Sequence, residues 1–153
     1  MASVYLRRGD HILLLYRQGN SVVSNLWIGS AGGHFEKDEV NNARDCVLRE
    51  LHEELGLSEN HLSELSLRYV TIRYLDGELR QNYYFFANLS NCDVDCPISN
   101  EGTTQWYTLS ELSDLLMPFT ARFMIDHYIS EGQFNSTLYG GIANQEGVTF
   151  TPL

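Results

Sequence analysis

The sequence is poor in several residue types, and each shortage excludes a class of protein. Its 153 residues include only 3 prolines and 12 glycines, too few for a low-complexity or disordered chain. Basic residues are also scarce, because 10 Lys and Arg face 20 Asp and Glu, which gives a formal charge of −10. This sign argues against a nucleic-acid polymer as partner, since phosphate backbones are bound by basic patches. A small phosphorylated ligand stays compatible with it if a cation mediates the contact.

Long apolar runs are missing as well. No stretch approaches the ~20 apolar residues of a membrane-spanning helix, and the first eight residues, MASVYLRR, contain no apolar run of signal-peptide length. We therefore expect a cytoplasmic protein with no membrane partner. The 3 cysteines are an odd number without a zinc-like pair of doublets, which favours reduced thiols. A redox pair of Cys92 and Cys96 is the alternative, although no histidine lies near them in the sequence.

The residues that are present suffice for one folded domain over 1–153. The hydrophobic share of 43% supports a core, and a chain of this length buries roughly 70% of its extended surface on folding. Neither a metal nor a disulfide is therefore needed for stability. We find no internal repeat and no linker.

Strand and helix patterns alternate along the chain. Short apolar or alternating runs predict strands at 4–8, 11–17, 26–28, 65–75, 78–89 and through Trp106-Tyr107, and two strand-like runs in 137–153. Helical patterns predict a helix at about 42–55, a short helix capped by Ser110, and a helix at about 118–129. We expect a polar loop at 18–25 and a flexible glycine-rich segment at 29–33. Strands that flank one central helix and end in another predict an α/β/α sandwich around a mixed sheet.

Two boundaries carry specific signals. Asn41 or Asn42 is a candidate N-cap for the helix at 42–55, and Gly56 is well placed to end that helix. Asp76-Gly77 lies between two alternating runs and predicts a hairpin with a type I′ turn.

The helix at 42–55 is unusually acidic on one face. Its leucines form a stripe that should face the core, namely Leu48, Leu51 and Leu55. Glu50, Glu53 and Glu54 stand at i, i+3 and i+4 and share the neighbouring face. Two carboxylates ~5.5 Å apart repel by about 3 kcal/mol at an effective dielectric near 20, so three together call for a counter-ion. Mg²⁺ fits because it bridges carboxylates to substrate phosphates; a solvated acidic face is the alternative.

The acidic helix contains the segment RELHEELGL at 49–57, and Gly33 and Glu39 precede it. With these residues the chain resembles the Nudix hydrolases. Their pattern is glycine, five residues, glutamate, seven residues, then Arg-Glu-aliphatic-any-Glu-Glu-any-Gly-aliphatic. Residues 49–57, RELHEELGL, match every fixed position of the second half, and Gly33 and Glu39 match the first half. Nine residues rather than seven separate Glu39 from Arg49, which we interpret as a two-residue insertion before the helix. The strand order resembles that of the family over most of the chain.

The resemblance implies a Nudix-type α/β/α sandwich with a central catalytic helix. It also implies hydrolysis of a nucleoside diphosphate linked to another group, with Mg²⁺, or Mn²⁺ in its place, as cofactor. The implied metal ligands are Glu50, Glu53, Glu54 and the Gly32 carbonyl. Such ions neutralise the pyrophosphate and lower the pKa of bound water. Glu53 is a candidate general base, and Glu101, in the loop before Trp106, is its rival; a solvated loop glutamate is the other interpretation of Glu101.

Further site residues follow from the same resemblance. Arg49 belongs to the catalytic group by holding Glu39 in an ion pair, and an exposed helix arginine is the alternative. Arg17, at the end of a strand, is placed where many relatives contact a phosphate, although a surface arginine fits its position equally well. Gly33 and Phe35 complete the candidates for substrate binding. Cys46 is interpreted as a packed residue rather than a catalytic thiol.

Three functional hypotheses remain open for this sequence. The first is hydrolysis of a (d)NTP, such as the oxidised purine 8-oxo-dGTP, to the monophosphate and pyrophosphate. Trp27, the missing proline before Gly32-Gly33 and the two strand-like runs of the tail favour it. The second is hydrolysis of a nucleotide sugar or ADP-ribose, and the third is a module that senses a nucleotide without cleaving it. In each case the partner is a small nucleotide, and the chain is a monomer or homodimer.

Overall fold

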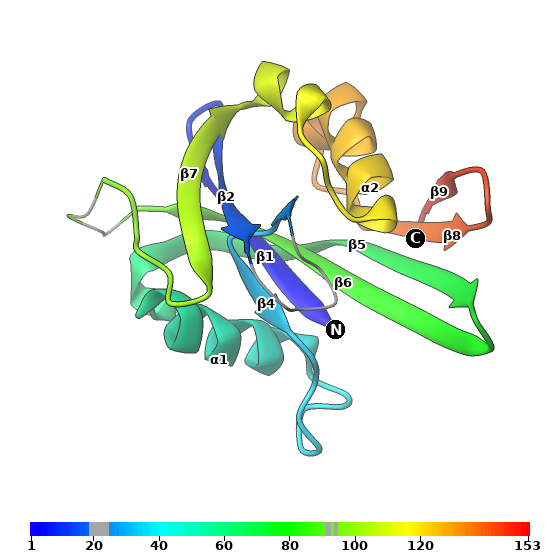
Figure 1. The fold of residues 1–153 in the computed structure, drawn as a ribbon, viewed down its shortest axis with the longest axis horizontal. Coiled ribbons are helices and arrows are strands. Elements are labelled where there is room, and N and C mark those ends of the chain that lie inside the picture. The colour runs from blue at the N-terminus through cyan, green and yellow to red at the C-terminus, as the bar shows by residue number, and fades with distance from the viewer. Residues whose placement is uncertain (19–24, 91–92, 94) are drawn as a thin grey trace.

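The structure, a computed structural model, describes residues 1–18, 25–90, 93 and 95–153. The two α-helices lie on opposite sides of a strongly twisted sheet (Figure 1). In chain order the elements are β1 (Ala2–Arg8), β2 (His11–Arg17), β3 (Leu26–Ile28), β4 (Ala31–Gly33), α1 (Ala43–Leu55), η1 (Glu59–His61), β5 (Leu62–Leu75), β6 (Glu78–Leu89), β7 (Gly102–Thr108), η2 (Leu109–Asp114), α2 (Phe119–Ser130), η3 (Gly132–Phe134), β8 (Tyr139–Ala143) and β9 (Val148–Pro152).

Within the described ranges the strands form one sheet in the order β3-β2-β1-β6-β5-β8-β9, with β4 paired to β1 and β7 paired to β2. The pairs β1–β6 and β5–β8 are parallel, and the other pairs are antiparallel. The predicted mixed sheet between helices is therefore confirmed. The β5–β6 hairpin turns at Asp76 and Gly77, both of which have positive φ (53° and 83°), as the predicted type I′ turn requires.

The core lies in two layers because β1 and β2 bury both of their faces. The first layer packs under α1 and includes Val4, Leu13 and Leu51. The second layer packs under α2 and includes Tyr5 and Leu14. Consecutive residues such as Leu13 and Leu14 therefore enter different layers. This arrangement is the α/β/α sandwich that the element order predicted.

Helix α1 begins and ends at the residues that the sequence indicated. The Asn42 side chain accepts a hydrogen bond from the Asp45 backbone N–H, and Gly56 adopts the left-handed conformation (φ 66°) and donates to the His52 carbonyl. The leucine stripe faces the core, since Leu51 and Leu55 are buried and Leu48 packs against them. The adjoining face of the helix is thereby directed toward β4 and the site described below.

Two expectations about local structure were wrong. Residues Ala31–Gly33 form β4 rather than a flexible segment, with Gly32 opposite Ser3 in β1. A Cβ on Gly32 would lie only 2.6 Å from the Ala2 carbonyl oxygen, so the missing side chain permits a close strand pairing that no periodicity could reveal. The short helix η2 is capped by Thr108, not Ser110, because Thr108 and Glu111 form a capping box.

Two other expectations fall partly outside the described residues. The loop expected at 18–25 lies mostly in 19–24, and the proposed redox pair includes Cys92, neither of which the structure describes. Cys96 is a half-buried free thiol whose Sγ lies 3.7 Å from the Thr104 carbonyl oxygen. Among the described helices none is both long enough and apolar enough to cross a membrane.

The leucine stripe can be tested by truncation. Leu51→Ala should lower the free energy of unfolding by about 2–5 kcal/mol, because it empties a core position under α1. Leu116→Ala is the matched control, since Leu116 is 72% exposed, and it should change that free energy by less than about 0.5 kcal/mol. Urea unfolding measures both, and equal losses in the two variants would contradict the assignment of the buried face.

Candidate active site

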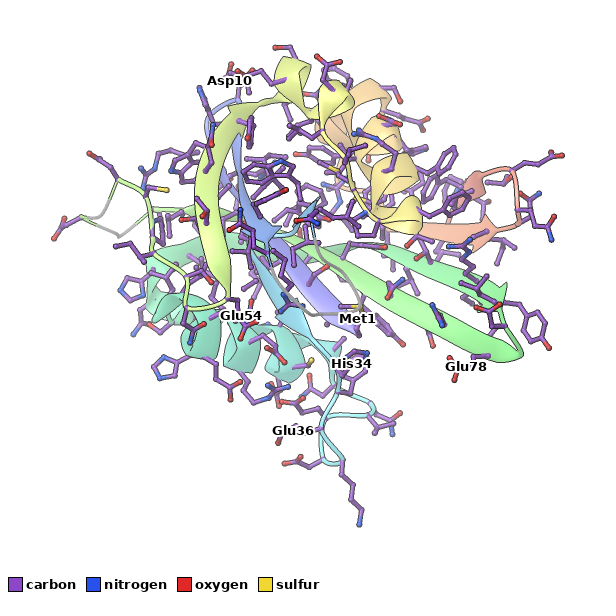
Figure 2. All side chains as sticks on the ribbon, in the orientation of Figure 1. Met1, Asp10, His34, Glu36, Glu54 and Glu78 are labelled. Carbon is purple, nitrogen blue, oxygen red and sulfur yellow. The ribbon has the colours of Figure 1, made fainter. Side chains whose placement is uncertain are left out.

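The candidate site lies where α1 packs beside β4. Helix α1 runs under the sheet, and Glu54 lies close to the start of β7 (Figure 2). His34 and Glu36 follow β4 into the loop that leads back to the helix, while Asp10 lies at the other end of the molecule (Figure 2). The first half of the Nudix-like motif therefore lies directly against its second half.

Gly33 is required at its position because of space rather than backbone conformation. A Cβ at this residue would lie 2.0 Å from Oε1 and 2.8 Å from Oε2 of Glu50. The Glu50 carboxylate thus occupies the volume that a side chain on β4 would fill, and its side chain is only 13% exposed. This contact explains in physical terms why a glycine precedes the acidic helix in the motif.

Arg49 holds the loop glutamate despite the two-residue insertion. Its Nε donates to Glu39 Oε1 at 2.8 Å and its Nη2 donates to Glu39 Oε2 at 2.9 Å. Nη2 also donates to the His34 carbonyl at 3.1 Å, which ties the loop to the helix. The hydrogen bonds from Arg49, followed by that from the Glu36 backbone N–H, lower the pKa of Glu39 to about 2. The ion pair that the family resemblance implies is therefore present.

The same arginine also contacts two glutamates of its own helix. Arg49 Nη1 lies 2.8 Å from Glu50 Oε1 and 3.1 Å from Glu53 Oε2. The Arg49 side chain is only 22% exposed, so the alternative of an exposed helix arginine does not hold. Cys46 packs beside it with no exposed surface, and burial raises the pKa of its thiol to about 11. Burial thus favours the neutral thiol, which agrees with the interpretation of Cys46 as a packed residue.

Glu54 is the most desolvated of the three helix glutamates. Its side chain is 6% exposed, its Oε2 accepts from the Gly32 backbone N–H at 3.0 Å, and its Oε1 accepts from Arg17 Nη2 at 3.3 Å. Burial raises the pKa of Glu54 to about 7, and the hydrogen bond from Gly32 and the charge of Arg17 oppose this rise. This carboxyl group consequently changes its charge near neutral pH.

Glu101 reaches the site through the pairing of β2 with β7. Arg17 lies opposite Gly102 in this pairing, and Arg17 Nη2 lies 3.2 Å from Glu101 Oε2. The loop before β7 is also attached to the end of α1, because Asn100 Nδ2 donates to the Glu53 carbonyl at 3.1 Å. Asn100 is a positioning residue that the sequence analysis missed, and only its place beside Glu101 hinted at it.

The three helix carboxylates do not gather as closely as their spacing suggested. Glu53 is 56% exposed, and among the described residues no three Asp, Glu, His or Cys side chains are arranged to hold a metal ion. Arg49 Nη1 contacts both Glu50 and Glu53, whereas Glu54 has a different set of partners, Arg17 and the Gly32 N–H. The donor set still fits a hard cation, since it consists of carboxylate oxygens partly removed from water.

A pocket of about 120 Å³ opens next to these carboxylates, on the α2 side of the sheet. It shares Arg17 and Gly32 with the carboxylate site, and its remaining walls come from β1, β3, β4, β6 and the start of α2. Tyr84 Oη lies 2.8 Å from Thr120 Oγ1 in its wall. Phe35 does not line this pocket, because it packs edge-to-face on Tyr83 with the ring centroids 5.5 Å apart, in the α1 layer.

Comparison with known proteins agrees with this geometry. The family model described as the NUDIX domain matches residues 1–127. A sandwich with this motif under its sheet defines the class of Nudix hydrolases, which are pyrophosphohydrolases. The chain belongs to the Nudix family. No curated protein sequence matches it.

Solved structures show the same fold at low sequence identity. A mutator MutT protein from Bacillus halodurans is 17% identical, with a TM-score of 0.64, and the match covers 99% of this chain and 95% of that protein. An Ap4A hydrolase from C. elegans is 16% identical, with a TM-score of 0.64 and coverages of 88% and 96%. A MutT Nudix hydrolase from Burkholderia pseudomallei is 24% identical, with a TM-score of 0.60 and coverages of 81% and 92%.

The raised pKa of Glu54 predicts how stability depends on pH. Between its ordinary value of 4.5 and about 7 the folded state holds a proton that the unfolded state has lost. This group therefore makes the protein less stable as the pH rises through that window, by about 3 kcal/mol at most. In chelator-treated samples, the unfolding free energy of Glu54→Gln minus that of wild type should therefore be larger at pH 8 than at pH 5. Urea unfolding at both pH values measures the difference, and a constant difference would contradict the desolvation of Glu54.

Proposed function

We propose that this Nudix hydrolase cleaves a (d)NTP to the monophosphate and pyrophosphate in a reaction that requires Mg²⁺ or Mn²⁺. The observation that carries this proposal is the sharing of Arg17 and Gly32 by the pocket and the carboxylate site. A nucleoside in the pocket places its phosphates beside the glutamates of α1. One binding mode can thus serve both recognition and hydrolysis.

The pocket has the character of a nucleobase site. Tyr5 and Tyr84 contribute aromatic surface, and Asn82 and Thr120 contribute polar atoms. The Asn82 amide carries donors and an acceptor, so it can read the edge of a base; its Nδ2 donates to Thr120 Oγ1 at 3.3 Å. An oxidised purine such as 8-oxoguanine is a candidate, because an added polar atom on the base calls for a hydrogen-bonding partner of this kind.

The chain's own residues divide the chemistry between them. Glu50, Glu53, Glu54 and the Gly32 carbonyl would hold the divalent ions, which supply positive charge for the pyrophosphate and lower the pKa of water. Arg17 binds a phosphate group through its planar guanidinium. Glu53, with its carboxylate 56% exposed, accepts the proton of the attacking water, and Glu101 is the rival for this role. The ion pair of Arg49 with Glu39 attaches the loop after β4 to helix α1.

A substrate panel tests the proposal directly. With Mg²⁺ we expect pyrophosphate and a nucleoside monophosphate from (d)NTPs, and a comparison of dGTP with 8-oxo-dGTP shows whether oxidised purines are preferred. Chromatography of the nucleotide products and a pyrophosphate assay provide the readout. AMP and ribose 5-phosphate from ADP-ribose, without activity on (d)NTPs, would instead identify a nucleotide-sugar hydrolase. Tight nucleotide binding without any turnover would identify a sensing module.

The glutamates of α1 can be tested without loss of the fold. Glu53→Gln and Glu54→Gln should lower kcat by about 10²–10⁴-fold, because each removes a carboxylate proposed for metal binding or proton transfer. Their melting temperatures without metal should stay equal or rise, since a like charge has been removed from the helix. Glu146→Gln, in the exposed turn between β8 and β9, is the control and should keep wild-type turnover. A sharp fall in melting temperature would contradict the proposed roles.

A further inference from the structure

Arg17 occupies the junction between the pocket and the carboxylates. Its side chain lines the pocket, while its Nη2 lies 3.3 Å from Glu54 Oε1 and 3.2 Å from Glu101 Oε2. A phosphate chain that extends from the pocket toward α1 must therefore pass this guanidinium. The side chain that would bind the phosphates is at present paired with the carboxylate that would bind a cation.

The hydrogen bonds of Arg17 are fewer and longer than those of Arg49. Both contacts of Arg17 use the same nitrogen, Nη2, and both are long; its buried Nε has no hydrogen-bond partner within the described part of the chain. Arg49 instead forms a two-pronged pair with Glu39 at 2.8 and 2.9 Å and also donates to the His34 carbonyl. A two-pronged pair is held in one geometry, whereas single long contacts exchange readily. Arg17 is thus the arginine that can leave its partners.

The two oxygens of Glu54 have different partners. Oε2 accepts from the backbone N–H of Gly32, which lies opposite Ser3 in the β1–β4 pairing. Oε1 is the oxygen that Arg17 Nη2 contacts, at 3.3 Å. A divalent ion held by Oε1 would add a second positive charge to an oxygen that Arg17 already contacts, in a largely buried site where like charges repel strongly. Glu101, which is 47% exposed, offers Arg17 a second partner outside that contact.

We propose that Arg17 and a divalent cation compete for Glu54 Oε1, so that binding of the ion releases Arg17 to the phosphates of the substrate. Arg17 is then a positioning residue for the metal site as well as a phosphate ligand. The exchange couples the two ligands, because an ion that frees Arg17 strengthens nucleotide binding, and the reverse holds by linkage. This inference rests on the proposed function, since it takes the α1 glutamates as the metal site.

The test measures Mn²⁺ affinity without any nucleotide, by calorimetry or by the electron paramagnetic resonance of free Mn²⁺. Arg17→Gln should bind Mn²⁺ about fivefold or more tightly than wild type, because the competing charge is gone. Arg80→Gln makes the same change in net charge at an exposed residue that pairs only weakly, at 3.4 Å, with Glu78. Its Mn²⁺ affinity should stay within about twofold of wild type, since exposed and distant charges are screened.

The second arm measures a non-hydrolysable dNTP analogue at saturating Mn²⁺. Arg17→Gln should bind this analogue more weakly than wild type, so the variant moves the two affinities in opposite directions. Arg17→Lys restores a positive charge and should return the Mn²⁺ affinity toward that of wild type. A merely structural role for Arg17 would weaken both ligands in Arg17→Gln and would overturn the exchange.

The outcomes separate the exchange from the metal site itself. If wild type binds Mn²⁺ and Arg17→Gln binds it equally or more weakly, the exchange is wrong while the metal site stands. If neither protein binds Mn²⁺, both the exchange and the metal-dependent function are wrong. Melting temperatures of the variants show whether each sample is folded before its affinities are compared.

Discussion

The site depends on one electrostatic constraint, which is that carboxylates crowded on a single face of α1 need positive charge close by. Two arginines supply it in different ways. Arg49, on the helix itself, is anchored by Glu39 and serves Glu50 and Glu53. Arg17 comes from the sheet and contacts Glu54 through one long hydrogen bond. Arg49 is therefore a fixed part of the site, while Arg17 is the arginine that we propose can exchange its partners.

The sandwich brings these charges together from distant parts of the chain. The β1–β4 pairing places Gly32 and Gly33 over α1, and the β2–β7 pairing places Glu101 beside Arg17. The pocket lies on the α2 side of the same strands, whereas the core cluster under α1 lies on their other side. The negative charge of the α1 glutamates is therefore compensated locally by Arg17 and Arg49, although the chain as a whole carries a formal charge of −10.

Much of the frame could be predicted from the sequence because local signals govern it. Asn42 and Gly56 delimit α1, and Asp76-Gly77 defines a hairpin turn. The family pattern also led to the Glu39–Arg49 pair, although an insertion separates its two halves. Features that depend on long-range pairing could not be predicted. The strand β4 has no periodicity, and the outward turn of Glu53 and the tether at Asn100 follow from tertiary contacts alone.

The two neighbouring glycines of β4, Gly32 and Gly33, lack side chains for different structural reasons. A methyl group on Gly32 would collide with the backbone of β1, whereas one on Gly33 would collide with the Glu50 carboxylate. A side chain at Gly32 would therefore disturb the β1–β4 pairing. A side chain at Gly33 would instead displace the Glu50 carboxylate, so that two adjacent glycines are required for unrelated reasons, one for the fold and one for the site.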